Sequence, residues 1–177
     1  HLLLDLRHQF SEFADPERRR RSQEPVTAAA LPWLRRNPYA LRDNLLLDDL
    51  EVAAAELALF RDLGGRTVVD CTSTGIRPQP ERLRDLACRT GLQIVAGCGY
   101  YTQDTHPPDL ATRPLADLAA GLLRDLTQGI GESGVRAGVI GEIGTSNPVH
   151  PSERRVLQAS ALAQRESGAP VYVHTYP

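Results

Sequence analysis

The sequence Ala137-Gly-Val-Ile-Gly-Glu-Ile-Gly-Thr-Ser146 predicts a short buried β-strand that carries one acidic residue, Glu142, among three glycines. A run of valine, isoleucine and glycine bounded by turn residues is typical of a strand buried on both faces of a parallel sheet. A carboxylate in such a place costs free energy unless a partner neutralises it. We therefore expect Glu142 to have a partner, and a pair of metal ions is the partner that we favour.

Length and composition limit the class of protein. The chain has 177 residues, of which 41% are hydrophobic, and this is enough for one sizeable core. Its net charge of -2 excludes nucleic-acid binding driven by bulk positive charge, so we expect no nucleic-acid partner. No apolar run reaches the roughly 18 residues that a membrane span needs, so we also expect no membrane partner.

The cysteines indicate a reducing compartment. Cys71, Cys88 and Cys98 match neither a CxxC metal motif nor an even disulfide framework, so reduced thiols and a cytoplasmic location are the expectation. Secretion stays open because the true amino terminus looks absent. The chain begins with His1 and stops soon after a strand-like segment, and both features indicate a piece of a longer protein.

Strand and helix patterns alternate along most of the chain after a polar, proline-rich segment over residues 7–44. Residues 1–6 are interpreted as the end of a further strand. Strands are predicted to begin near residues 66, 92, 137 and 170, and helices are predicted over 48–63, from Pro80, from Pro114 and from an N-cap at Ser152. This alternation predicts a parallel sheet with right-handed crossovers. Connectivity alone does not distinguish an open, doubly wound sheet from a closed barrel.

Three residues able to bind metal stand at predicted strand ends: His1, Glu142 and His174. The carboxyl ends of parallel strands are where reacting groups collect, and a carboxylate has two oxygens that can bridge two cations. Each residue also has an ordinary explanation. Glu142 could be satisfied by backbone amides or an arginine, His174 could be a hydrogen-bonded core histidine, and His1 could be only the first residue of the chain. His106 and His150 lie in proline-containing loops and are expected to be exposed, outside any site.

Four motifs in this order resemble the phosphotriesterase family of the amidohydrolase superfamily, and most closely its phosphotriesterase-related and lactonase-like members. They are His1-Leu-Leu-Leu-Asp-Leu6, Val68-Val-Asp-Cys-Thr72, Gly141-Glu-Ile-Gly-Thr-Ser146 and Gly168-Ala-Pro-Val-Tyr-Val-His-Thr175. The resemblance implies a (β/α)8 TIM barrel, an α/β fold. The chain would supply the end of strand one through strand five as a single incomplete domain over residues 1–177.

The resemblance also implies a binuclear metal centre at the mouth of the barrel. His1 matches the second histidine of the family's first-strand His-x-His, and His174 matches the strand-five histidine. Glu142 takes the place of the bridging ligand, a carboxylated lysine in many members, and is assigned the catalytic role of setting the metal spacing. Tyr101 resembles a tyrosine that lines the substrate cavity, although a rim aromatic packed on its loop is the alternative. Later family ligands, a histidine and an aspartate, have no counterpart here.

The function implied is metal-dependent hydrolysis of small lactone, carboxylic ester or phosphotriester substrates through a metal-bridging hydroxide. Two divalent ions are expected, with Zn²⁺ first and Mn²⁺, Co²⁺ or Fe²⁺ as alternatives. Family resemblance makes a homodimer a reasonable expectation. The competing hypothesis is a catalytically inactive barrel fragment or a non-catalytic α/β binding domain.

Overall fold

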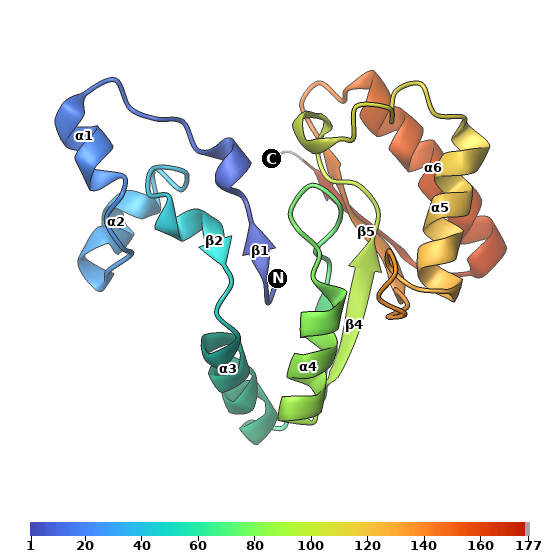
Figure 1. The fold of residues 1–177 in the computed structure, drawn as a ribbon, viewed down its shortest axis with the longest axis horizontal. Coiled ribbons are helices and arrows are strands. Elements are labelled where there is room, and N and C mark those ends of the chain that lie inside the picture. The colour runs from blue at the N-terminus through green and yellow to red at the C-terminus, as the bar shows by residue number, and fades with distance from the viewer. Residues whose placement is uncertain (176–177) are drawn as a thin grey trace. The chain divides into compact units, whose positions relative to one another are not determined.

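The computed structural model describes residues 1–175, which divide into two compact units (Figure 1). The larger unit comprises residues 1–2 and the chain from residue 49 onward, and the smaller unit comprises residues 3–48. All four predicted site residues belong to the larger unit. The interpretation of the chain as a single domain stays a prediction.

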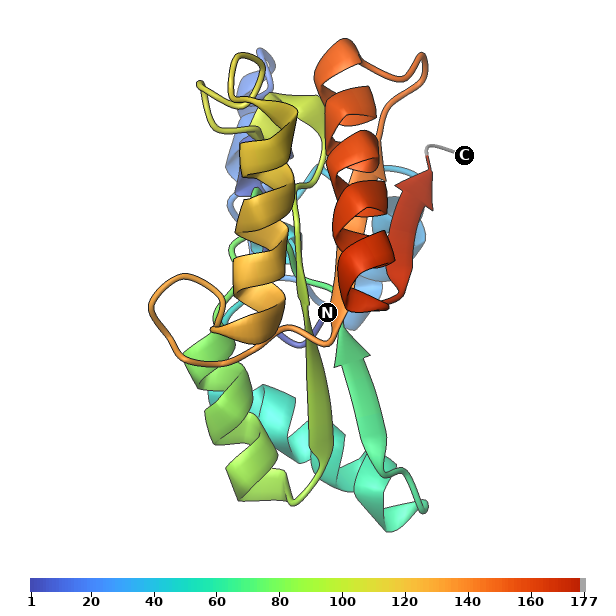
Figure 2. The same ribbon diagram turned by 90° about the vertical axis from the view of Figure 1, so that its right-hand side faces the viewer.

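A parallel four-stranded sheet forms the centre of the larger unit. Its strands follow chain order and are β3 (Thr67–Asp70), β4 (Gln93–Cys98), β5 (Val139–Thr145) and β6 (Val171–Thr175). The sheet curls, and no neighbouring pair reverses the order as a doubly wound sheet does at its switch point. Chain-order winding with a helix in each connection is the pattern of a (β/α)8 barrel, so the sheet is part of a barrel (Figure 2).

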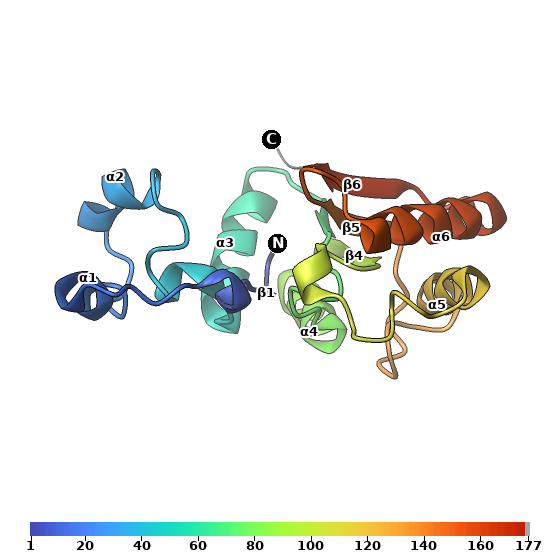
Figure 3. The same ribbon diagram turned by 90° about the horizontal axis from the view of Figure 1, so that it is seen from above.

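The helices of the larger unit confirm the predicted alternation with small shifts at their ends. They are α3 (Leu50–Asp62), α4 (Pro80–Thr90), α5 (Leu115–Thr127) and α6 (Pro151–Ser167). The side chain of Asp49 accepts the N–H groups of Glu51 and Val52 at the start of α3, which satisfies two otherwise unpaired donors. Gly91 and Gly168 end α4 and α6 in the left-handed conformation, which glycine adopts without steric cost. Helices α5 and α6 lie side by side (Figure 3).

Two loop histidines make contacts that the sequence did not predict. The N-cap of α6 is His150, not Ser152, because the His150 ring accepts the N–H of Ser152 and Glu153 completes a capping box. His150 is exposed as expected. The prediction that His106 is exposed is wrong. His106 is partly buried, and its ring nitrogens lie 2.9 Å from the Tyr101 carbonyl oxygen and 3.1 Å from the Ser152 hydroxyl.

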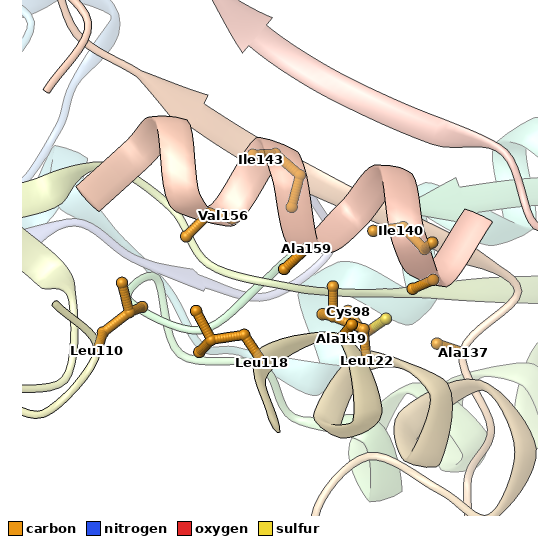
Figure 4. Close-up of a cluster of buried hydrophobic side chains, with 11 residues drawn as sticks. Cys98, Leu110, Leu118, Ala119, Leu122, Ala137, Ile140, Ile143, Val156 and Ala159 are labelled. Carbon is orange, nitrogen blue, oxygen red and sulfur yellow. The ribbon is translucent and has the colours of Figure 1, made fainter. Parts of the chain in front are cut away.

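The apolar core of the larger unit lies between the sheet and helices α5 and α6. Figure 4 shows Ile140 and Ile143 of β5 together with side chains of these helices, among them Leu118, Leu122 and Val156. Both isoleucines are fully buried. Every residue of β5 except Glu142 is buried, which confirms the prediction of a strand buried on both faces. The sheet therefore holds the backbone on either side of Glu142 by close packing.

The smaller unit is built from short elements. Strand β1 (Leu4–Asp5) pairs antiparallel with β2 (Leu46–Leu47), a pairing that the sequence did not indicate. Two short helices, α1 (Pro16–Arg21) and α2 (Leu31–Leu34), and three 3-10 turns connect them. Among the described residues of both units, no helix is long and apolar enough to cross a membrane.

Candidate metal centre

Glu142 projects from β5 between two imidazole rings. Its Oε1 lies 2.8 Å from His174 Nδ1, and its Oε2 lies 3.4 Å from His1 Nε2. The Glu142 side chain is only 13% exposed. The structure therefore brings together three of the residues that the sequence pointed to, with each carboxylate oxygen facing a different ring.

The charge of Glu142 needs compensation in this position. Within residues 1–175, the carboxylate contacts are with the two imidazoles and not with an arginine or a backbone amide. A neutral imidazole that turns its lone pair toward a carboxylate is repelled by it. Protons on the rings or cations held between ring and carboxylate can each remove that repulsion.

His1 is held at the end of β3. Its Nδ1 lies 2.9 Å from the hydroxyl oxygen of Thr72, which leaves Nε2 as the atom that faces Glu142. The backbone N–H of Leu2 donates to Oδ2 of Asp70 at 2.6 Å, and the N–H of Thr72 donates to Oδ1 of the same carboxylate at 2.9 Å. Asp70 is 1% exposed. The buried carboxylate thus fixes the backbone on both sides of the His1–Thr72 contact.

The backbone of Glu142 is held by the same segment. Its N–H donates to the carbonyl oxygen of Cys71 at 2.8 Å, and its carbonyl oxygen accepts the hydroxyl of Ser73 at 2.7 Å. Burial, followed by the charges of Glu142 and Asp70, raises the pKa of the Cys71 thiol. The raised pKa favours the neutral thiol, which is a poor metal ligand.

His174 stands on β6 beside the predicted substrate-binding residue. Its side chain is 46% exposed, and its ring meets the Tyr101 ring edge to face, with centroids 5.7 Å apart. The Thr145 hydroxyl donates to the backbone carbonyl of His174 at 3.1 Å. Gly144 lies opposite His174 in the sheet, and a Cβ on Gly144 would meet the backbone of Thr102 at 2.6 Å. This close approach brings the Tyr101 loop up to the ring.

Sequence reasoning missed Asp70, Thr72 and Ser73 as parts of the site. The available signal was a run of polar residues directly after the apolar strand that begins at Thr67. That signal marks a loop at a strand outlet, but it does not tell which backbone groups the polar side chains will reach.

The donor atoms form two pairs and not one cluster. Within the described residues, no group of three or more histidine, cysteine, aspartate or glutamate side chains could hold one ion. Zinc lies about 2.0–2.2 Å from imidazole nitrogen or carboxylate oxygen, so two such ligands stand about 3.4 Å apart at a tetrahedral angle and about 2.9 Å apart at 90°. The observed separations of 3.4 Å for His1 and 2.8 Å for His174 are close to these values. Imidazole nitrogens and carboxylate oxygens are donor types that suit divalent cations.

The model of the phosphotriesterase family matches residues 2–177. The chain belongs to this family. The resemblance read from the four sequence motifs is confirmed, and with it the interpretation of the curled sheet as part of the family's barrel.

Relatives support the same assignment. The chain is 42% identical over 155 residues to a phosphotriesterase-related protein of Nematostella vectensis and 41% identical over 154 residues to an N-acetyltaurine hydrolase of Danio rerio. Each match covers 86% of this chain and 44% of the relative. The chain therefore spans less than half the length of these phosphotriesterase-family proteins.

Two solved structures have a fold similar to that of this chain. A resiniferatoxin-binding protein from Rhodobacter sphaeroides aligns with a TM-score of 0.93 and 36% identity, over 98% of this chain and 49% of that protein. The lactonase Lmo2620 from Listeria monocytogenes aligns with a TM-score of 0.68 and 26% identity, over 73% of this chain and 45% of the lactonase. Both alignments support the assignment to a partial TIM barrel.

Proposed function

We propose that this chain supplies half of a two-metal hydrolase site, in which Glu142 bridges two divalent cations while His1 and His174 each bind one. The observation that carries the proposal is the placement of two imidazole nitrogens opposite two different oxygens of one partly buried carboxylate. A single ion pair would need only one ring. Two rings on opposite oxygens suit a carboxylate that serves two cations.

The chemistry of the donors favours Zn²⁺, with Mn²⁺, Co²⁺ and Fe²⁺ as further candidates. When bound, two such ions supply a water activated at neutral pH and an electrophile for the bond that is cleaved. This chain's residues would hold the ions and set their spacing. The Tyr101 ring, packed against His174, would form one wall of the space that the substrate enters.

The names of the relatives favour a carbonyl compound as substrate. N-acetyltaurine is an amide and a lactone is a cyclic ester, so each relative named for one of them acts on a carbonyl carbon that bears a heteroatom leaving group. We therefore rank small carboxylic amides, esters and lactones first and phosphotriesters second. A homodimer and a cytoplasmic location stay predictions.

A second candidate is binding of a small molecule without turnover. It is favoured by the alignment with the resiniferatoxin-binding protein, whose name records binding and not hydrolysis. In this case His1, Glu142 and His174 would form a network in which imidazole N–H groups donate to the carboxylate. That network needs no metal.

Metal analysis of the full-length gene product separates these candidates. We expect about two equivalents of divalent metal per chain, and we expect Glu142→Gln to lose at least one of them, because a neutral amide cannot bridge two cations. Glu51→Gln is the matched control, since Glu51 lies on the exposed start of α3 and should leave the metal content unchanged. A metal-free wild-type protein would refute the proposed function and favour the binding candidate.

Activity should follow the metal. We expect the loaded protein to hydrolyse at least one member of a panel containing N-acetyltaurine, a γ-lactone, a carboxylic ester and a phosphotriester, and we expect a chelator to abolish this turnover. Turnover that survives complete metal removal would contradict the proposal.

Bicarbonate tests the identity of the bridging ligand. A glutamate carboxylate is permanent, whereas a carboxylated lysine forms only with carbon dioxide. We therefore expect the rate of metal reconstitution of the apoprotein to be the same with and without added bicarbonate. A marked acceleration by bicarbonate would show that Glu142 is not the bridge.

A further inference from the structure

We infer that the four residues Asp70–Ser73, at the outlet of β3, are the positioning element of the proposed centre and hold His1 and Glu142 in register before any cation binds. The role that we assign to this segment rests on the proposed function. The contacts themselves are independent of a metal.

Thr72 sets the orientation of the His1 ring. Nδ1 lies 2.9 Å from the Thr72 hydroxyl oxygen, and this contact is a hydrogen bond in either tautomer: with the proton on Nε2 the hydroxyl donates to Nδ1, and with a cation on Nε2 the proton stays on Nδ1, which donates to the hydroxyl oxygen. Metal-binding histidines generally use one nitrogen for the ion while the other donates to a neighbouring acceptor, which fixes the tautomer and the ring angle. Thr72 would serve as that acceptor.

Asp70 fixes the two backbone segments that carry His1 and Thr72. Its two oxygens accept the N–H of Leu2, next to His1, and the N–H of Thr72. Hydrogen bonds to an ionised carboxylate are stronger than neutral ones, and this carboxylate is almost fully buried. Asp70 therefore limits both the position of His1 and the position of the hydroxyl that orients its ring.

The alternate residues of the same segment hold Glu142. Cys71 provides a carbonyl oxygen for the Glu142 N–H, and Ser73 donates its hydroxyl to the Glu142 carbonyl oxygen. Residues 70 and 72 thus serve the His1 side, while residues 71 and 73 serve the Glu142 side. One short segment therefore sets the separation of two ligands that lie far apart in the sequence.

Gly97 allows the segment to reach β5. Strand β4 lies between β3 and β5, so no direct ladder joins the outlet of β3 to Glu142. A Cβ on Gly97 would stand 2.0 Å from the carbonyl oxygen of Gly141 and 3.1 Å from Cα of Cys71. The two backbones converge over this position only because it carries no side chain.

The test uses the full-length gene product and three substitutions at or near the segment. Thr72→Val removes the hydroxyl at nearly constant volume, and Thr72→Ser restores it. Thr67→Val is the matched control because Thr67 is exposed at the start of the same strand. Affinity for Zn²⁺ is measured by competition with a chelator, and the state of the His1 ring in the apoprotein is measured from its nitrogen NMR shifts.

We expect Thr72→Val to lower the affinity for one of the two Zn²⁺ ions about 10–100-fold, which is the usual effect of losing a partner that orients a metal ligand. Thr72→Ser should recover most of this loss, and Thr67→Val should bind like the wild type. In the apoprotein, only Thr72→Val should change the tautomer populations of His1. A folded Asp70→Asn variant should also have a lower affinity for Zn²⁺, because the amide cannot accept both N–H groups as a carboxylate does.

The outcomes separate the two proposals. A wild-type protein that binds zinc, with Thr72→Val equal to Thr67→Val in both affinity and His1 tautomer, would overturn the positioning role while leaving the hydrolase proposal standing. A wild-type protein that binds no zinc, with the His1 tautomer still changed in Thr72→Val alone, would refute the metal centre and support the positioning of His1.

Discussion

The two units of the chain are stabilised in different ways, and the difference explains why the candidate site lies in the larger one. The larger unit has a continuous apolar core beneath a parallel sheet, whereas the smaller unit has a small cluster of Ala30, Leu34 and Leu41 with Trp33 packed against it. A site that needs donor atoms placed within tenths of an ångström requires backbones that packing holds rigidly. Only the larger unit offers them.

Buried polar groups strengthen the larger unit at the mouth of the sheet. Glu153 is fully buried, and its carboxylate accepts the N–H groups of Gln103, Ser146 and His150 and the Ser146 hydroxyl. Burial alone would raise the pKa of Glu153, but these hydrogen bonds outweigh it and lower the pKa. The charged carboxylate ties together the loops that follow β4 and β5.

Contacts between arginine side chains and aromatic rings stabilise the smaller unit. The guanidinium of Arg21 lies 4.4 Å from the centre of the Trp33 ring, and that of Arg18 lies 4.4 Å from the centre of the Phe13 ring. Such contacts are worth about 0.5–1 kcal/mol at exposed sites. They order short segments but do not replace a core.

The largest expected effect comes from the core of the larger unit. Ile143→Ala removes a fully buried side chain of β5 and should lower the free energy of unfolding by about 2–5 kcal/mol. Val52→Ala, on the exposed face of α3, should change it by less than about 0.5 kcal/mol. Urea unfolding followed by far-ultraviolet circular dichroism measures both. Equal effects would show that the sheet is not the main source of stability.

The same contrast explains what the sequence could predict. Periodic apolar residues and glycine or proline at element ends located β3 to β6 and the helices between them, because repeated local signals agree with the sheet. The smaller unit has no such period, so the pairing of β1 with β2 was missed. In the structure His174 lies at the end of β6, Glu142 lies in the middle of β5 and His1 precedes β1. All three were named as candidates because imidazole and carboxylate side chains near apolar strand patterns are readable in the sequence. The roles of Asp70 and Ser73 were not predicted, because they act on backbone groups distant in sequence.

Substitutions at two glycines of the larger unit test whether the Tyr101 loop is packed closely against β5. Gly144→Ala would bring a Cβ within 2.6–2.7 Å of the backbone of Thr102 and Tyr101, so the loop must move, at a cost of about 1–3 kcal/mol. Gly121→Ala, within α5 with nothing inside 4 Å of its Cβ, should instead stabilise the protein by about 0.5–1 kcal/mol. Thermal unfolding distinguishes the signs. A neutral Gly144→Ala would mean that the Tyr101 loop is not held against β5.

The histidine that holds this loop predicts a pH dependence. Burial lowers the pKa of His106, opposed by the Tyr101 carbonyl and the charges of Glu153 and Asp104, while His150 lowers it further. Because the folded pKa lies below the unfolded value of 6.5, the unfolded chain takes up the proton first as the pH falls below 6.5. Stability is therefore lost as the pH decreases toward the folded pKa.

His106→Gln should isolate this contribution. At pH 7.5 the variant loses a hydrogen bond and about 1 kcal/mol of stability, but it should lose less than the wild type between pH 7.5 and 5.5, because glutamine does not titrate. Identical losses in His106→Gln and the wild type would contradict the lowered pKa.

The smallest expected effect lies in the smaller unit and can be observed separately, because the chain has one tryptophan, Trp33, and it lies there. Arg21→Ala removes the guanidinium over the Trp33 ring and should cost about 0.5–1 kcal/mol in the transition followed by tryptophan fluorescence. Arg20→Ala removes the same charge from the same helix but only an exposed pair with Glu24, so it should cost less than about 0.5 kcal/mol. If the two units unfold separately, the circular dichroism transition of the sheet should not move in either variant. If fluorescence and circular dichroism shift together in Arg21→Ala, the units unfold as one cooperative body, and the contrast between them is one of local structure only.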